Sequence, residues 1–342
     1  MQSRRYDHNY KFITITSAVY SRHLIIYDQI SITTPNWKIM RTQQVTVASR
    51  GSDVLGESPV WDARDGVLYW VDIREGALRR LQMSDDGPGE RTRSFRLGVG
   101  LLTGVTTATG NALLIGLARG IATAGTRDLD APDILRPVLA AQCLAPQNRL
   151  NEIKTDPSGR IWCGAMWDYA RGRSGALYRV DGTDLTCVRP HVTVPNALAF
   201  SPDGKWIYFC DSAIGVIERA PFDVESGRVG AWHELIGAAQ APGKPDGLAV
   251  DADGCLWSAR FGAGCVIRFT PDGKRDTVIE LPVSQPTSCA FGGDDLRTLF
   301  ITTATQGLAA HDLAREPLAG SLFSVRTSAS GLPLADARVP GS

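Results

Sequence analysis

The sequence predicts an all-β protein, a six-bladed β-propeller whose blades are four-stranded antiparallel sheets. Three observations predict it: a strand–turn–strand unit that recurs along the chain, a nearly constant spacing of these units, and no long window with the 3.6-residue apolar period of a helix. The 35 glycines and 19 prolines fit a chain with many tight turns. One such sheet cannot bury its faces alone, so the blades must stack around a central channel.

The recurring unit is an apolar run, a turn rich in Asp, Pro, Ser and Gly, and a second run rich in Trp, Tyr, Phe and Ile. Residues 201–208, which read Ser-Pro-Asp-Gly-Lys-Trp-Ile-Tyr, are a clear copy, and residues 292–301 are the sixth. An Asp-Gly or Ser-Gly pair supplies the positive φ that a tight hairpin requires. The turn glycines of the first five copies are separated by 44, 49, 45 and 50 residues, a period typical of propeller blades: Gly66, Gly110, Gly159, Gly204 and Gly254.

The six copies lie between about residues 45 and 338, which we predict to be one propeller domain. A second pattern, as in residues 175–179 (Gly-Ala-Leu-Tyr-Arg), follows several hairpins and predicts the third strand of a blade. Residues 1–44 precede the repeat and are expected to be an extension outside the fold. Met40 comes shortly before the first copy, so we expect it to be the natural start and residues 1–39 to be dispensable.

The composition argues against several classes of partner. Lys plus Arg and Asp plus Glu number 36 each, so the net charge gives no reason to expect nucleic acid or an anionic membrane surface. No stretch of 18 apolar residues would span a bilayer. The seven cysteines are spread along the chain without a Cys-x-x-Cys pair, which fits a reducing, cytoplasmic compartment and no thiolate zinc site. We expect a monomer or a weak homo-oligomer.

The repeat also indicates which residues face the channel. Eight residues before the turn glycine of three blades stand Asn151, Asn196 and Asp246, and Glu57 stands nine before that of the first blade. The first strand of a propeller blade lines the channel, so these side chains should converge near one mouth. Buried polar groups need partners, and two interpretations are open: hydrogen-bonded caps around ordered water, or an oxygen-rich site for a divalent cation such as Ca²⁺, Mg²⁺ or Mn²⁺, with Zn²⁺ and Fe²⁺ also possible.

Several blocks together resemble the gluconolactonase/regucalcin (senescence marker protein) family over about residues 45–338. They are residues 56–61 (Gly-Glu-Ser-Pro-Val-Trp), 68–73 (Leu-Tyr-Trp-Val-Asp-Ile), 148–152 (Asn-Arg-Leu-Asn-Glu), 195–198 (Pro-Asn-Ala-Leu), 245–248 (Pro-Asp-Gly-Leu) and 285–293. The resemblance implies a six-bladed propeller that hydrolyses a sugar (aldono) lactone to the aldonic acid. It also implies one divalent metal ion, of Ca, Zn, Mg, Mn or Fe, held by Glu57, Asn196 and Asp246. Asp246 would serve as the proton donor and acceptor, and Arg149 and Asn151 would hold the hydroxyl groups of the substrate.

Three positions depart from the family pattern. The family usually has Asn-Asp where this chain has Asn151-Glu152, and Asn-Gly where it has Asn196-Ala197. A substrate-contacting acid expected after residues 164–166 (Gly-Ala-Met) is at best Asp168. These departures concern the identity of the sugar more than the chemistry.

The expected reaction is the hydrolysis of a lactone, which is a cyclic ester. The metal ion would act as a Lewis acid on the lactone carbonyl, and the residues alone do not decide whether Asp246 takes the proton of the attacking water or only positions it. A serine hydrolase is disfavoured because no Gly-x-Ser-x-Gly motif occurs. A non-catalytic calcium-binding or protein-docking propeller is the alternative, and Arg149 beside Asn151 argues against it.

Overall fold

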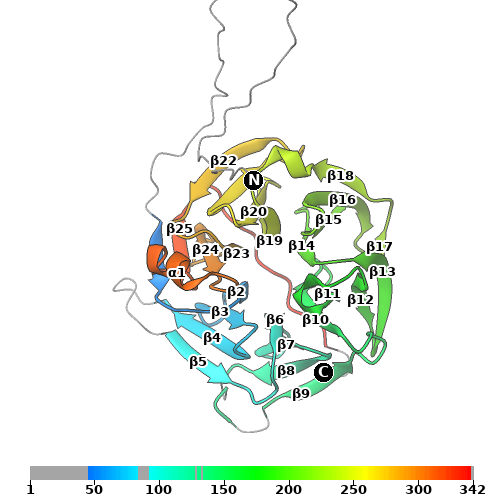
Figure 1. Cartoon of the computed structure of the whole chain (residues 1–342). Helices are drawn as coiled ribbons and strands as arrows, with labels where there is room; N and C mark the ends of the chain where they lie inside the picture. The colour runs from blue at the N-terminus through cyan, green and yellow to red at the C-terminus, as the bar shows by residue number, and fades with distance from the viewer. Residues whose placement is uncertain (1–44, 84–91, 128, 132–133, 340–342) are drawn as a thin grey trace, which may run out of the picture. The chain divides into compact units, whose positions relative to one another are not determined.

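Six antiparallel sheets lie around a common axis as the blades of a propeller (Figure 1). The computed structural model describes residues 45–83, 92–127, 129–131 and 134–339. The predicted fold class is therefore confirmed. The expectation that residues 1–44 form an extension, with a natural start at Met40, lies outside the described residues.

In each blade the chain runs outward from the innermost strand. The first three blades are β2 (Gly56–Asp62), β3 (Val67–Asp72), β4 (Ala77–Gln82) and β5 (Thr92–Arg96); β6 (Leu102–Ala108), β7 (Ala112–Leu117), β8 (Gly120–Gly125) and β9 (Arg136–Ala140); and β10 (Asn148–Thr155), β11 (Ile161–Trp167), β12 (Gly175–Asp181) and β13 (Asp184–Val192).

The other three blades follow in the same order. They are β14 (Pro195–Phe200), β15 (Trp206–Asp211) and β16 (Val216–Asp223) with β17 (Arg228–Val229) and β18 (His233–Ile236) both paired to β16; β19 (Lys244–Val250), β20 (Leu256–Phe261), β21 (Cys265–Phe269) and β22 (Arg275–Glu280); and β23 (Pro286–Gly292), β24 (Thr298–Thr303), β25 (Leu322–Arg326) and β1 (Thr46–Ser49). The helical elements in the described residues are short: η1 (Asp168–Ala170), η2 (Ala238–Gln240) and α1 (Ala310–Arg315). None of them is long and apolar enough to cross a membrane.

The sixth blade is completed by a strand from the other end of the domain. β1 pairs antiparallel with β25, with Thr46 opposite Ser324 and Val47 opposite Phe323. The repeat did not reveal this fourth strand, because β1 lies far in sequence from the hairpin that it joins. Pairing of the first and last strands closes the ring, so the sixth blade leaves no unpaired edge at β25.

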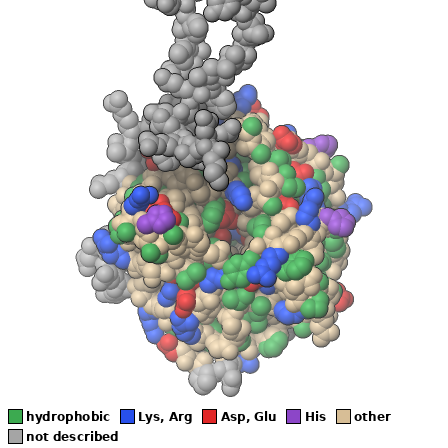
Figure 2. Space-filling model, in the orientation of Figure 1, with side chains coloured by type: hydrophobic (Ala, Val, Ile, Leu, Met, Phe, Trp, Pro, Cys, Tyr) green, Lys and Arg blue, Asp and Glu red, His purple; other side chains and the backbone are tan. Residues whose placement is uncertain are grey.

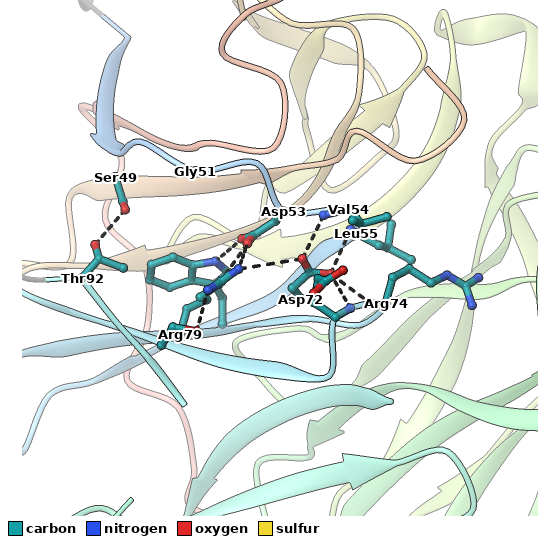
Figure 3. Close-up of polar contacts among 12 residues, drawn as sticks. Ser49, Gly51, Asp53, Val54, Leu55, Asp72, Arg74, Arg79 and Thr92 are labelled. Carbon is teal, nitrogen blue, oxygen red and sulfur yellow. Dashed lines mark hydrogen bonds and ion pairs between the residues drawn. The ribbon is translucent and has the colours of Figure 1, made fainter. Parts of the chain in front are cut away.

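Asp53 holds the connection between β1 and the first blade (Figure 3). Its buried carboxylate accepts hydrogen bonds from the indole Nε1 of Trp70 at 2.8 Å and from Nη2 of Arg79 at 2.7 Å, while its backbone N–H donates to the carbonyl of Gly320 at 3.0 Å. Asp72 lies beside this group and accepts backbone hydrogen bonds from residues 54 and 55. The linker is thus tied to the first and the sixth blade at once.

The hairpin turns explain why acidic residues recur with the glycines. The fully buried Asp156 and Asp251 each begin a turn and accept the indole N–H of a buried tryptophan six residues later, at 3.1 Å from Trp162 and 2.8 Å from Trp257. The same carboxylates accept backbone N–H groups of their own turns. The turn chemistry therefore also anchors the aromatic core between the blades.

The C-terminal segment, residues 327–339, crosses the propeller where the inner strands end. Its backbone bonds to four blades: Gly331 to Leu296 at 2.7 Å, Ser330 to Ala252 at 2.8 Å, Ala337 to Thr107 at 2.9 Å and Arg338 to Gly159 at 2.8 Å. Beneath it lies a mainly apolar cavity of about 380 Å³, lined by residues 332–335 and by the ends of the inner strands. The cysteines are all free thiols, five of them buried.

Replacing Asp53 with Ala should lower the free energy of unfolding by about 3 kcal/mol, because it leaves the buried indole N–H of Trp70 without an acceptor and removes the ion pair with Arg79. Chemical denaturation would measure this. The control is Asp295→Ala, which breaks an exposed pair with Arg326 and should leave the midpoint nearly unchanged. Equal effects of the two changes would contradict the anchoring role of Asp53.

Candidate active site

The predicted channel residues converge at one mouth of the channel. Asn151 on β10, Asn196 on β14 and Asp246 on β19 come from three neighbouring blades and form one line of hydrogen bonds. The amide Nδ2 of Asn151 donates to Oδ1 of Asn196 at 2.9 Å, and Nδ2 of Asn196 donates to Oδ1 of Asp246 at 2.7 Å. Figure 2 shows this face of the molecule hollowed near its centre, with acidic side chains in the hollow and Lys or Arg side chains bordering it.

Glu57 lies at the matching position of β2 and belongs to the same electrostatic cluster. Burial, followed by the negative charges of Glu57 and Glu152, holds the pKa of Asp246 well above its usual range. Burial and the charge of Glu152 likewise raise the pKa of Glu57. Carboxylates that raise one another's pKa in this way lack sufficient positive charge nearby, and a bound cation would supply it.

The free oxygens of these side chains fit a cation site. Glu57 uses Oε2 to accept the backbone N–H of Ser58 at 3.0 Å, and Asp246 uses Oδ1 to accept from Asn196. Oε1 of Glu57 and Oδ2 of Asp246 have no hydrogen-bond partner among the described residues. Oδ1 of Asn196 accepts one hydrogen bond and keeps a second lone pair. In the described part of the chain, no group of three or more His, Cys, Asp or Glu side chains has metal-binding geometry. The predicted set is of a different kind, because it contains two carboxylates and one amide, that of Asn196.

A one-residue bulge brings each of these side chains to the mouth. The pairing of the inner strand with its neighbour shifts directly after or around Glu57, Asn151, Asn196 and Asp246. The following residue adopts a left-handed backbone in three of the four strands: Ser58 at φ 50°, Glu152 at 52° and Ala197 at 55°. In the fourth, a Cβ on Gly247 would lie 2.0 Å from Oγ of Ser288, so crowding requires glycine there. Ala197 carries a Cβ and still adopts this left-handed backbone, so it occupies a strained position.

Glu152 is a channel residue that the sequence analysis did not assign. The bulge turns its buried side chain toward the next blade, where Oε2 accepts the backbone N–H of Leu198 at 3.1 Å. Burial raises its pKa to about 7. Strand alternation alone would place Asn151 and Glu152 on opposite faces, so only the bulge could have indicated this contact. Thr103 on β6 and Thr287 on β23 lie at the bulge positions that match Glu152. The sequence analysis assigned neither of them.

Arg149 extends the line of polar contacts toward solvent. Its Nη1 donates to Oδ1 of Asn151 at 2.9 Å, and its Nε donates to Oδ1 of Asp168 at 2.7 Å. The acid that pairs with Arg149 is therefore Asp168, not the neighbouring Glu152. Nη1 of Arg74 donates to the other oxygen of Asp168 at 2.9 Å. Burial alone would raise the pKa of Asp168, but the hydrogen bonds from the two guanidinium groups outweigh it and lower the pKa to about 2.

Two further residues at the mouth, Arg74 and Gln306, could not be identified from the sequence repeat. Arg74 follows β3, and its Nε donates to Oε1 of Gln306 at 2.7 Å. Gln306 lies between β24 and α1, more than 230 residues away in sequence. No motif or spacing connects the two, so only the closed ring brings them together.

A propeller with this cluster of carboxylate and amide side chains at one channel mouth has a clear counterpart among known families. The family model described as "SMP-30/Gluconolactonase/LRE-like region" matches residues 55–305. The chain belongs to this family, and the resemblance seen in the sequence is confirmed.

Named relatives cover nearly the whole propeller. The chain is 40% identical over 285 residues to 6-deoxy-6-sulfogluconolactonase of Pseudomonas putida, an alignment that covers 82% of this chain and 94% of the relative. It is 34% identical to pentonolactonase XacC of Haloferax volcanii, over 82% and 93% of the two chains. Among solved structures, a calcium-binding protein, regucalcin, from Agrobacterium tumefaciens superposes with a TM-score of 0.79 at 28% identity, over 85% of this chain and 96% of that one.

Replacing Ala197 with Val should lower the free energy of unfolding by about 2–3 kcal/mol, because a β-branched side chain strongly disfavours the left-handed backbone and the site is fully buried. Ala199→Val is the matched control, since Ala199 lies two residues further along β14 outside the bulge and is only half-buried. Thermal and chemical unfolding would measure both. Equal stability of the two variants would show that the bulge carries no strain.

Proposed function

We propose that this enzyme hydrolyses a sugar lactone to the open aldonic acid, with one divalent metal ion held by Glu57, Asn196 and Asp246. The observation that carries the proposal is the convergence of these three side chains at one channel mouth: Asn196 donates to Asp246, and the charge of Glu57 acts on Asp246. Asn151 is hydrogen-bonded to Asn196, and Arg149 to Asn151. Relatives named as sulfogluconolactonase, pentonolactonase and L-arabinolactonase support the reaction class. They act on different sugars, so the particular lactone has to be found by experiment.

The metal ion, when bound, supplies a Lewis acid for the lactone carbonyl oxygen. The residues of the chain supply the rest. Asp246 would face the metal ion with Oδ2. Its Oδ1 accepts one hydrogen bond from Asn196 and keeps a second lone pair, so Oδ1 can take the proton of the attacking water and return it to the ring oxygen. Asn196 keeps this carboxylate in place by donating to it from the neighbouring blade.

Arg149 and Asn151 orient the sugar. Nη1 of Arg149 donates to Oδ1 of Asn151, and Nδ2 of Asn151 donates to Pro195 O at 2.8 Å and to Asn196, so the two side chains are fixed before substrate arrives. Fixed donors lose little freedom on binding. The free Nη2 of Arg149 is directed to hydroxyl groups of the ring.

A calcium-binding propeller without catalysis is the second candidate. One observation favours it: the regucalcin from Agrobacterium tumefaciens is described as a calcium-binding protein. Both functions would use the same ligands, and only the lactone assay separates them. For the cellular setting, seven free thiols support a cytoplasmic location, and we propose a monomer or weak homo-oligomer.

Glu57→Gln, Asn196→Ala and Asp246→Asn should each lower kcat/KM for lactones by about 10³-fold or more, since each removes a ligand or the proton carrier. Metal analysis of the purified wild type should find about one divalent ion per chain, and chelation should abolish activity. Asp203→Asn in an exposed turn is the control and should change neither activity nor metal content. Full activity after exhaustive chelation would refute the metal role, and metal binding without hydrolysis of any lactone would favour the second candidate.

Arg149→Ala should raise KM for lactones by about tenfold while metal content stays at the wild-type level, because Arg149 contacts Asn151 and none of the three proposed ligands. A fall in kcat as well would place the guanidinium on the developing oxyanion. The melting temperature must be measured alongside, since the side chain is buried and paired with Asp168. Unchanged kinetics of Arg149→Ala on every lactone that the wild type hydrolyses would show that Arg149 does not contact the substrate.

A further inference from the structure

Arg74 carries a cationic group to the mouth of the channel from the first blade. Its backbone N–H donates to Oδ1 of Asp72 at 3.1 Å, while its side chain leaves the cluster around Asp53 and points away from it (Figure 3). Hydrogen bonds to Gln306 and Asp168 then fix the guanidinium. A side chain held on both sides in this way is prepared for a ligand before the ligand arrives.

Two guanidinium groups and one carboxylate form the outer rim of the mouth. Arg74 and Arg149 share a single carboxylate, that of Asp168, and the other partner of Arg74 is the neutral Gln306. The ring of Tyr169 covers the Arg74 guanidinium at 4.0 Å. Nη2 of Arg74 and Nη2 of Arg149 have no hydrogen-bond partner among the described residues. The Nη2 donor of Arg74 is thus left available for a ligand, and within the described ranges the only carboxylate that pairs with Arg74 is shared with Arg149.

The line of polar contacts from the buried interior to the rim gives the direction in which a substrate would lie. Tyr169 is 59% exposed, the side chains of Asp168 and Arg74 are 28% and 11% exposed, and Asp246 is 8% exposed. The contacts run continuously from Asp246 through Asn196, Asn151, Arg149 and Asp168 to Arg74. Asp246 and Arg74 stand at the two ends of this line of contacts, so a lactone with its carbonyl at Asp246 that extends along the line would bring the far end of its carbon chain toward Arg74.

We propose that Arg74 selects sugar lactones that carry an anionic group, a sulfonate or a phosphate, on the carbon farthest from the ring carbonyl. The proposal rests on the lactonase function proposed above and specifies its substrate class. A planar guanidinium matches the oxygens of such a group, and charge-assisted hydrogen bonds are about twice as strong as neutral ones. Tyr169, whose ring lies over the Arg74 guanidinium, shields the contact between Arg74 and the anion from water.

The test compares lactones that differ only at the terminal carbon: glucono-1,5-lactone, its 6-phosphate, and 6-deoxy-6-sulfoglucono-1,5-lactone. For the wild type we expect kcat/KM for at least one anionic lactone to exceed that for the neutral lactone by about tenfold. In Arg74→Gln this ratio should fall to about one, mainly through KM, and Arg74→Lys should restore part of it. The phosphate and sulfonate arms decide which anion is preferred.

The control is Arg96→Gln, which removes an exposed guanidinium from β5 of the same blade, where it pairs with Glu75. It should leave the ratio of anionic to neutral kcat/KM at the wild-type value. An equal loss on neutral and anionic lactones in Arg74→Gln would show that Arg74 only positions Asp168, and would overturn the proposal. A wild type that hydrolyses the neutral lactone as well as both anionic ones would also overturn it while leaving the lactonase function intact.

Direct binding separates a failure of this proposal from a failure of the proposed function. Calorimetry on the metal-loaded wild type should show tighter binding of 6-deoxy-6-sulfogluconate or 6-phosphogluconate than of gluconate, and Arg74→Gln should remove the difference. If the wild type hydrolyses no lactone, this preference still supports anion selection by Arg74. Equal binding of the three acids would overturn it.

Discussion

A bulge of one residue near the start of each inner strand determines the geometry of the channel mouth. In a regular strand, successive side chains alternate between the two faces of the sheet. The bulges turn Glu57, Asn151, Asn196 and Asp246 to the same opening, and three of them hold a residue other than glycine in left-handed backbone. This strain is maintained only because neighbouring blades pack on both sides of every inner strand. The site is thus a property of the closed ring, and no single blade could form it.

The charges at the mouth are arranged in layers along the channel axis. Glu57, Glu152 and Asp246 repel one another in the interior, and Lys154 on the inner side offsets part of this repulsion. Arg149 and Arg74 lie on the outer side and are held by Asp168. When no ligand is bound, repulsion among the like charges in the interior lowers the free energy of unfolding. The same arrangement attracts a cation inward and holds an anionic group at the rim, so stability is reduced where binding is gained.

The parts of the fold that depend on local chemistry could be predicted from the sequence. Turn glycines recur because the tight hairpins need them. Counting back from these glycines located Asn151, Asn196 and Asp246, since the bulge lies eight residues before the turn glycine in these three blades. Contacts between blades could not be predicted in this way. Gln306 meets Arg74 only across the ring, β1 meets β25 only at closure, and Glu152 faces the channel only because of the bulge. Such pairs leave no periodic trace in the sequence.

The closing strand has a consequence for the time course of synthesis. Thr46 on β1 bonds to Ser324 on β25, 278 residues later, so β1 emerges from the ribosome roughly 15–55 s before its partner at typical translation rates. During that interval β1 has no strand beside it, and five blades can form around an open gap. The last blade then depends on the earliest strand, which makes ring closure a late and strongly non-local step of folding. Until it is complete, the exposed edges on either side of the gap are the surfaces through which two nascent copies could pair with each other.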